Sequence, residues 1–137
     1  MYKGIIFASF LLSFAVHADE LVNFSAATKA ISEGRRITFV VDFKQCSAQM
    51  PLPVAMASIT PNAVLVVGGN RITASDRHFS LDDPSARGLP TFSYSKFNIN
   101  SEGTASMNIT VMSAVNYEQL NAYQINCNLG EGFKIFS

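Results

Sequence analysis

The chain has 137 residues, with ten basic and ten acidic side chains and a formal net charge of zero. Charged residues make up 15% of the chain and hydrophobic residues 48%, a composition that favours a packed domain over a disordered segment. The basic residues are scattered, and only Arg35 and Arg36 are adjacent, so we expect no nucleic-acid partner.

The first eighteen residues have the pattern of a cleaved signal peptide. Lys3 supplies the positive charge, residues 4–16 are apolar, and Ala18 ends a small-residue cleavage site. The apolar run is shorter than the roughly 20 residues that span a bilayer, and no second long run follows. We therefore predict a signal peptide at residues 1–18, a single domain at residues 19–137, no integral membrane segment after cleavage, and a periplasmic or secreted location.

A helix and a strand are predicted at the start of the mature domain. Apolar residues recur at helical spacing over residues 20–33, Asp19 or Asn23 could cap the helix, and Gly34 stands where a helix commonly ends. Residues 37–43 then alternate apolar and polar side chains, which predicts a buried strand.

Residues 47–61 contain three prolines among apolar side chains, which predicts a long loop or irregular crossing. Met50, Leu52 and Met56 are the candidate binding residues of this segment. Two interpretations remain open: the segment packs over the sheet as a cover, or it presents an apolar surface to a partner.

The remaining chain predicts hairpins. Residues 63–67 pair with residues 71–74 through a two-residue glycine turn, which places Leu65, Val67 and Ile72 on one face. Residues 91–99 pair with residues 104–112 in a register that sets Phe92 opposite Val111 and Tyr94 opposite Ile109. Phe97 would then point to the other face of the strand from Phe92, which a bulge near Ser95, or partial cover of both faces, would explain. Shorter strands at 122–128 and 133–136 complete an α+β fold: an N-terminal helix followed by a mostly antiparallel β-meander that could curl into a half-barrel or a small barrel.

The two cysteines, Cys46 and Cys127, allow one pairing. In an oxidising compartment a structural disulfide is the default, and it would close a loop of about 80 residues worth roughly 4 kcal/mol in the chain-entropy model. A free, reactive thiol is the alternative.

The densest polar segment contains Asp76, His78 and Ser80, which would share one face of a strand. A small hydrolase could use such a set, but no nucleophile elbow or oxyanion-hole signature accompanies it, and the competing interpretation is a strand end followed by a turn. Cleavage would remove His17 and leave one histidine, so we expect neither a metal site nor a cofactor.

The chain resembles the VirK family of small exported bacterial proteins associated with virulence. The resemblance is carried by the signal peptide and by segments at residues 30–34, 40–46, 71–72, 76–80 and 126–133. It implies an exported, virulence-associated protein with no enzymatic activity to transfer. We therefore expect a non-enzymatic domain that binds an unknown protein or small ligand, with a periplasmic carrier of a small apolar ligand as the alternative and a small hydrolase as the less favoured one.

Overall fold

The structure is a computed structural model that describes residues 17–137. Residues 1–16, which hold most of the predicted signal peptide, lie outside the described residues, so cleavage after Ala18 stays a prediction. The described elements are α1 (Phe24–Ser32), β1 (Thr38–Asp42), η1 (Phe43–Gln45), β2 (Ser47–Ala48), β3 (Met56–Ile59), β4 (Ala63–Val67), β5 (Arg71–Ser80), η2 (Pro84–Ala86), β6 (Thr91–Asn100), β7 (Thr104–Ser113), β8 (Gln119–Leu129) and β9 (Gly132–Phe136).

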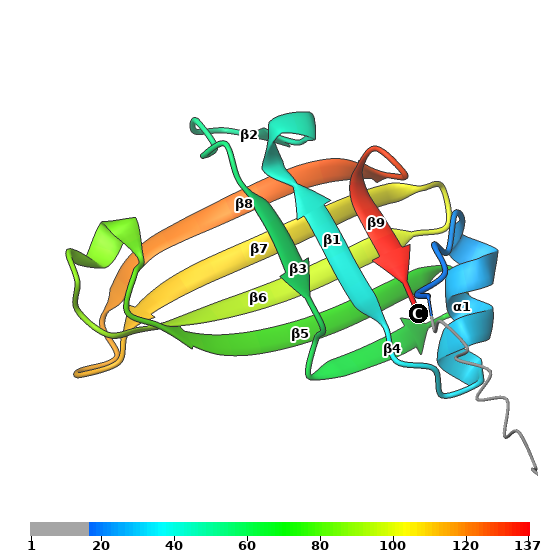
Figure 1. The fold of residues 1–137 in the computed structure, drawn as a ribbon, viewed down its shortest axis with the longest axis horizontal. Helices are drawn as coiled ribbons and strands as arrows, with labels where there is room; N and C mark the ends of the chain where they lie inside the picture. Colours follow the sequence, from blue (N-terminus) through cyan, green and yellow to red (C-terminus); the bar gives the residue numbers. More distant parts are fainter. Residues whose placement is uncertain (1–16) are drawn as a thin grey trace, which may run out of the picture.

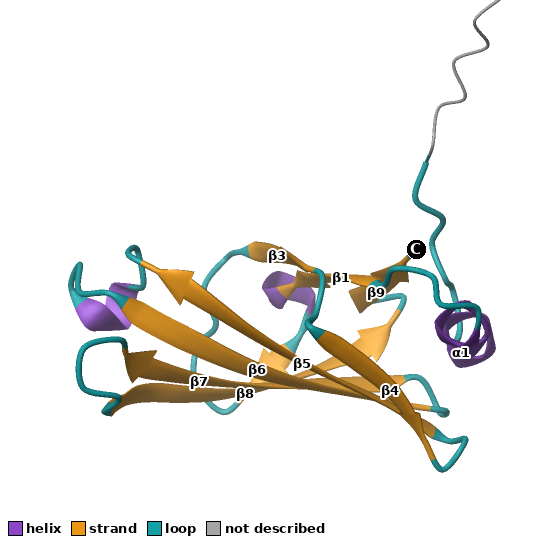
Figure 2. Ribbon diagram, turned by 90° about the horizontal axis from the view of Figure 1, so that it is seen from below, coloured by secondary structure: helices purple, strands orange, loops and turns teal. Residues whose placement is uncertain are grey.

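The strands form one strongly curved sheet with the order β3-β1-β9-β8-β7-β6-β5-β4. The long strands β5 to β8 make one layer, and the short strands β3, β1 and β9 cross over it as a second layer (Figures 1 and 2). All pairings are antiparallel except the two-residue contact of β8 with β9. The edge strands β3 and β4 are not paired with each other, so the sheet is a half-barrel. This confirms the predicted α+β fold with its mostly antiparallel sheet.

Helix α1 begins directly after its N-cap residue, Asn23. The Asn23 side chain accepts a hydrogen bond of 2.8 Å from the Ala26 backbone N–H, and Gly34 ends the helix with a φ of +71°. The helix is shorter than predicted at its start because the preceding residues pair with the C-terminal strand. The Leu21 N–H donates to the Ile135 carbonyl at 2.7 Å. Ala27 and Ala30 are buried against the sheet.

The prediction of a long loop over residues 47–61 was wrong in part. The segment contains β2, which pairs with β8, and β3, which pairs with β1 along its full length. Pro51 and Pro53 precede β3 and Pro61 follows it, so none of them has to donate to the ladder. β3 is also an edge strand, the position in a sheet where neighbouring prolines are best tolerated.

Both predicted hairpins exist, but their registers differ from the prediction by one residue. Three residues rather than two connect the strands in each hairpin, so Val66 pairs with Ile72, and Ser95 with Ile109. A one-residue shift moves every side chain to the other face of a strand. Leu65 and Val67 are consequently exposed, away from the buried Ile72. The pairings of β6 are regular, so the bulge predicted near Ser95 is absent, and the observed irregularity lies between β7 and β8.

The packed core occupies the end of the half-barrel next to α1. Phe39, Phe97 and Phe133 come from three strands and are fully buried, with ring centroids 5.0 to 6.2 Å apart. Such tilted aromatic contacts are favourable beyond the area that they bury.

Cys46 and Cys127 form the predicted disulfide, which joins the residue after η1 to β8. Gly132 lies against this bridge with a φ of +79°, and an added Cβ would approach the Cys46 Sγ to 2.8 Å. The corner between β8 and β9 therefore depends on the absence of a side chain at this residue.

Candidate functional site

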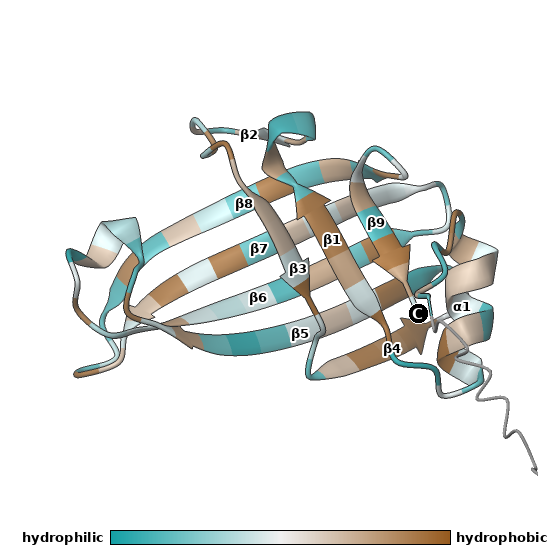
Figure 3. Cartoon of the chain, in the orientation of Figure 1, coloured by the Kyte–Doolittle hydropathy of each residue, from teal (hydrophilic) through white to brown (hydrophobic). Residues whose placement is uncertain are grey.

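The inner face of the long strands changes character from one end to the other. Directly opposed residues of β5, β6, β7 and β8 form rows of side chains that point to the same face. Two rows near α1 are apolar: Ile72, Ile99, Ala105 and Cys127, then Ala74, Phe97, Met107 and Ile125. The next two rows are polar at the β5 end: Asp76, Ser95, Ile109 and Tyr123, then His78, Ser93, Val111 and Asn121. Figure 3 shows the polar stretch of β5.

A cavity of 530 Å³ lies over these mixed rows. We call it the trough. Its floor is the inner face of β5 to β8, and its roof comes from β3 and the segment before it. Its volume falls within the range of small-molecule sites. It is lined by Phe43, Leu52, Pro53, Ala57, Ser58, Ile59, Thr60, Asp76, His78, Asp83, Pro84, Ser93, Ser95, Met107, Ile109, Val111, Tyr123 and Ile125.

The side of the trough that is formed by β5 and β6 is polar, and we call it the polar wall. The Asp76 side chain is only 12% exposed, and its carboxylate lies 3.7 Å from the Nδ1 of His78, beyond hydrogen-bond distance. The His78 side chain is 54% exposed and therefore lies at the mouth. Ser95 is 4% exposed, and its Oγ has no hydrogen-bond partner among the described residues. An unsatisfied buried hydroxyl is unusual in folded proteins.

The side of the trough that is formed by β7 and β8 is apolar, and we call it the apolar wall. Met107, Ile109 and Val111 project from alternate positions of β7, and Tyr123 and Ile125 do so from β8. The Tyr123 hydroxyl accepts a hydrogen bond of 2.6 Å from the Asn121 side-chain amide, which positions the phenol ring. The trough thus offers an apolar wall beside a polar one.

Three of the six candidate binding residues line the trough: Leu52, Asp76 and His78. Ser80 lies on the same face of β5, and its Oγ accepts a hydrogen bond from the Asp82 backbone N–H, which ends the strand. Met50 and Met56 are exposed and do not line the trough. Met56 is on the opposite face of β3, because Ala57 and Ile59 are the inward residues of that strand.

The sequence analysis missed Ser93 and Ser95. The alternation of β6 carries the signal, because stepping back by two from the buried Ile99 reaches Phe97, Ser95, Ser93 and Thr91 in turn. The predicted register instead set Phe92 opposite Val111 and Tyr94 opposite Ile109, whereas Phe92 pairs with Met112 and Tyr94 with Thr110. These aromatic residues lie on the convex face, where the Arg77 guanidinium stands 5.1 Å above the Phe92 ring.

The trough holds the elements of neither a metal centre nor an assembled catalytic triad. No group of three or more His, Cys, Asp or Glu side chains within residues 17–137 is placed to hold a metal ion. Asp76 is the only partner of His78 in this part of the chain, and neither Ser80 nor Ser93 is hydrogen-bonded to the imidazole.

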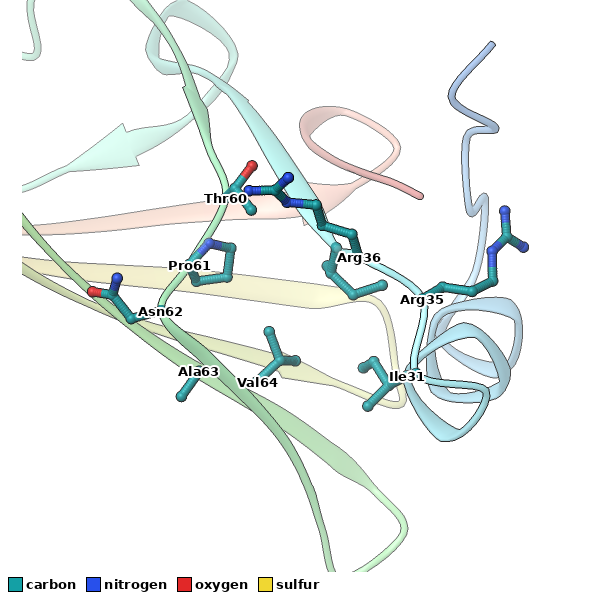
Figure 4. Close-up of a pocket in the computed structure, with 10 residues that line it drawn as sticks. Ile31, Arg35, Arg36, Thr60, Pro61, Asn62, Ala63 and Val64 are labelled. Carbon is teal, nitrogen blue, oxygen red and sulfur yellow. The ribbon is translucent and has the colours of Figure 1, made fainter. Parts of the chain in front are cut away.

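A second cavity, of 460 Å³, lies between α1 and the connection from β3 to β4 (Figure 4). Ile31 and Val64 point into it from opposite sides, and Arg36 extends toward Thr60. Arg35 points away, and its guanidinium donates to the Ser137 carbonyl at 3.1 Å. This cavity lies at the open edge of the half-barrel, because the connection that lines it joins the two edge strands β3 and β4. Its lining includes no buried polar atom without a partner.

None of the helices in the described part of the chain has the length and apolar character needed to cross a membrane. Comparisons with known proteins agree with one another. A family model described as VirK protein matches residues 20–117. A crystal structure of a VirK family protein from Legionella pneumophila is 58% identical in sequence and superposes with a TM-score of 0.83, covering 86% of this chain and 98% of that one. No similar protein was found among curated protein sequences.

Proposed function

The chain belongs to the VirK family, and from this premise we propose that it is an exported, non-enzymatic binding protein whose small-ligand site is the trough. Family membership supports a virulence-associated protein. The observation that carries the proposal is the trough itself, a 530 Å³ cavity with an apolar wall and a polar wall inside a disulfide-bonded half-barrel. Pockets that combine apolar lining with a few placed polar groups are the usual form of small-molecule sites.

Export is supported by two independent features. The N-terminal sequence has the pattern of a cleaved signal, and Cys46 is bonded to Cys127, which is compatible with an oxidising compartment. Fractionation of bacteria that express the full chain tests this part of the proposal. We expect a periplasmic or secreted product that begins at Asp19 by intact mass, and an unprocessed cytoplasmic product would contradict it.

A non-enzymatic role is supported by the surroundings of His78. A hydrolase would need a hydroxyl hydrogen-bonded to the imidazole, and no serine hydroxyl of the described residues makes a hydrogen bond to His78. One arrangement keeps hydrolysis as the second candidate, because Ser93 stands directly opposite His78 and Asp76 lies two residues away on the same strand. If His78→Ala or Ser93→Ala abolished turnover of an ester substrate, the non-enzymatic proposal would be wrong.

Ligand binding is tested with a matched pair of variants on β6. Ser93 and Lys96 lie on opposite faces of this strand, so Ser93→Leu fills the trough while Lys96→Leu changes only the convex surface. The exported protein is purified, extracted with organic solvent and analysed by mass spectrometry. We expect a small molecule in extracts of the parent chain and of Lys96→Leu, and a loss of it in Ser93→Leu. Clean extracts from all three, with no small-molecule probe bound, would overturn the proposal.

A further inference from the structure

We propose that the trough selects an amphiphile whose head carries a protonated amine. This inference rests on the proposed function, since it names the class of ligand for the same site. The head would lie over β5 and β6, beside Asp76 and Ser95, and the apolar tail would lie along β7 and β8.

The charge of the lining favours a cation. Asp76 and Asp83 are its two carboxylates, and none of the described residues that line the trough is a lysine or an arginine. His78 at the mouth is the single basic group of the lining. An anionic head would therefore meet carboxylates with no lysine or arginine beside it, whereas an ammonium would meet opposite charge.

The polar wall favours a ligand that donates hydrogen bonds. Asp76 is only 12% exposed, its carboxylate receives no hydrogen bond from any described residue, and the His78 Nδ1 lies 3.7 Å away. Ser95 is directly opposite Asp76 on β6, and its Oγ also has no partner. A buried hydroxyl without a partner, like that of Ser95, is costly, and the carboxylate of Asp76 can only accept. An ammonium has three N–H donors and could satisfy both groups at once.

The same row of side chains supplies the place for a tail. From Asp76 and Ser95 the row continues to Ile109 on β7 and Tyr123 on β8. The side chains of this row therefore become less polar from β5 to β8. Leu52 and Ile59 face this line from the roof. A molecule with a polar end and an apolar end would match both walls in a single orientation.

The test compares three probes of equal chain length, decylamine, decanol and decanoate, by calorimetry with the purified exported protein at neutral pH and below micelle formation. We expect decylamine to bind at least about tenfold tighter than decanoate, with decanol between them. Asp76→Asn should remove most of the preference for the amine while keeping affinity for decanol. Ser95→Ala should weaken the amine and the alcohol by a similar, smaller factor. Glu102→Gln, in the exposed turn after β6, is the matched control and should change none of these affinities.

The outcomes separate this inference from the proposal on which it rests. If decanoate bound as well as decylamine, or if folded Asp76→Asn kept the preference for the amine, the head-group assignment would be overturned while the trough remained a ligand site. If none of the probes bound and the organic extracts were clean, the proposed function would fall as well. Circular dichroism of each variant confirms folding, and Ser95→Ala tests the same wall if Asp76→Asn does not fold.

Discussion

The end of the half-barrel next to α1 and the trough are built by the same four long strands, yet they differ in almost every physical property. At the first, Ile72, Ile99 and Phe97 are fully buried and the aromatic cluster fills the space between the layers. At the second, Asp76 and Ser95 occupy the equivalent inward positions only a few residues further along. The difference teaches that one face of a sheet can hold two kinds of surface: the filled end buries apolar side chains, and the trough keeps polar groups beside an open cavity.

The largest expected effect tests whether the two layers of the half-barrel depend on one covalent link at the filled end. Replacing Cys46 and Cys127 with alanine removes the bridge between the residue after η1 and β8. We expect a loss of about 2–5 kcal/mol in the free energy of unfolding, because the unfolded chain gains the freedom of a long loop. Urea unfolding of the oxidised parent and the double variant measures it. An unchanged midpoint would mean that packing alone joins the layers.

A matched pair of isoleucines compares the ends directly. Ile99→Ala at the filled end should cost about 2–5 kcal/mol, because it leaves a cavity in close packing. Ile109→Ala in the trough should cost clearly less, because that side chain is only partly buried and faces an existing cavity. Thermal and urea unfolding of both variants provide the measurement. Equal losses would break the distinction between a packed end and an open one.

The helix supports only the filled end, so weakening it should leave the trough intact. Asn23→Ala removes the side-chain oxygen that caps α1 and should destabilise the protein by about 1 kcal/mol. The affinity of the trough for decylamine should stay at its parental value in the folded variant. A change in that affinity would show that the two ends are coupled.

In the trough, a substitution that removes a polar group should cost almost nothing in stability. The Ser95 hydroxyl is buried and unpartnered, so Ser95→Ala should leave the free energy of unfolding unchanged or raise it by up to about 1 kcal/mol. Calorimetric melting of the ligand-free protein tests this. A loss of 2 kcal/mol or more, on the order of a broken buried network, would mean that Ser95 belongs to the packed core.

The smallest effect concerns the exposed helix surface outside both ends. The Lys29 ammonium bonded to Glu33 lowers the pKa of that carboxyl. Because the pKa is lower in the folded chain, the pair stabilises the fold at pH values above the unfolded-state pKa of Glu33, and this contribution is lost as the pH falls through the folded-state value. The melting temperature of Lys29→Ala should therefore be slightly below that of the parent chain at neutral pH, and the difference between the two should disappear in acid. A difference in melting temperature that did not change with pH would assign the effect to helix propensity instead.

Much of the fold could be predicted from the sequence, because local patterns determine its elements. The capping Asn23, the terminating Gly34 and the alternation around Phe39 each produced the predicted structure. The disulfide was also predictable, since two cysteines allow only one pair. The edge strand β3 was hidden by the prolines around it, whose effect on pairing depends on which side of the strand faces a neighbour.

The candidate site was harder to predict, because it depends on register. A turn of three residues instead of two moves Phe92 to the convex face and Ser95 to the inner one, and no local pattern in Ser101-Glu102-Gly103 distinguishes these lengths with certainty. Asp76 and His78 were recognised as a polar pair on one face, but the apolar wall opposite them comes from strands about 30 to 50 residues later in the chain. Such juxtapositions follow from the topology of the sheet rather than from any segment alone.

Segments that are far apart in the sequence meet in the fold, and this bears on the order in which structure can form. Asp19 and Ser137 exchange backbone hydrogen bonds, and the fully buried Phe133 lies only four residues before the C-terminus. β1 pairs with β9, which follows all the other strands in chain order, so β1 gains this neighbour only after the intervening strands have been synthesised. Such a non-local pairing slows folding, because the long intervening chain must be ordered before the two strands can meet.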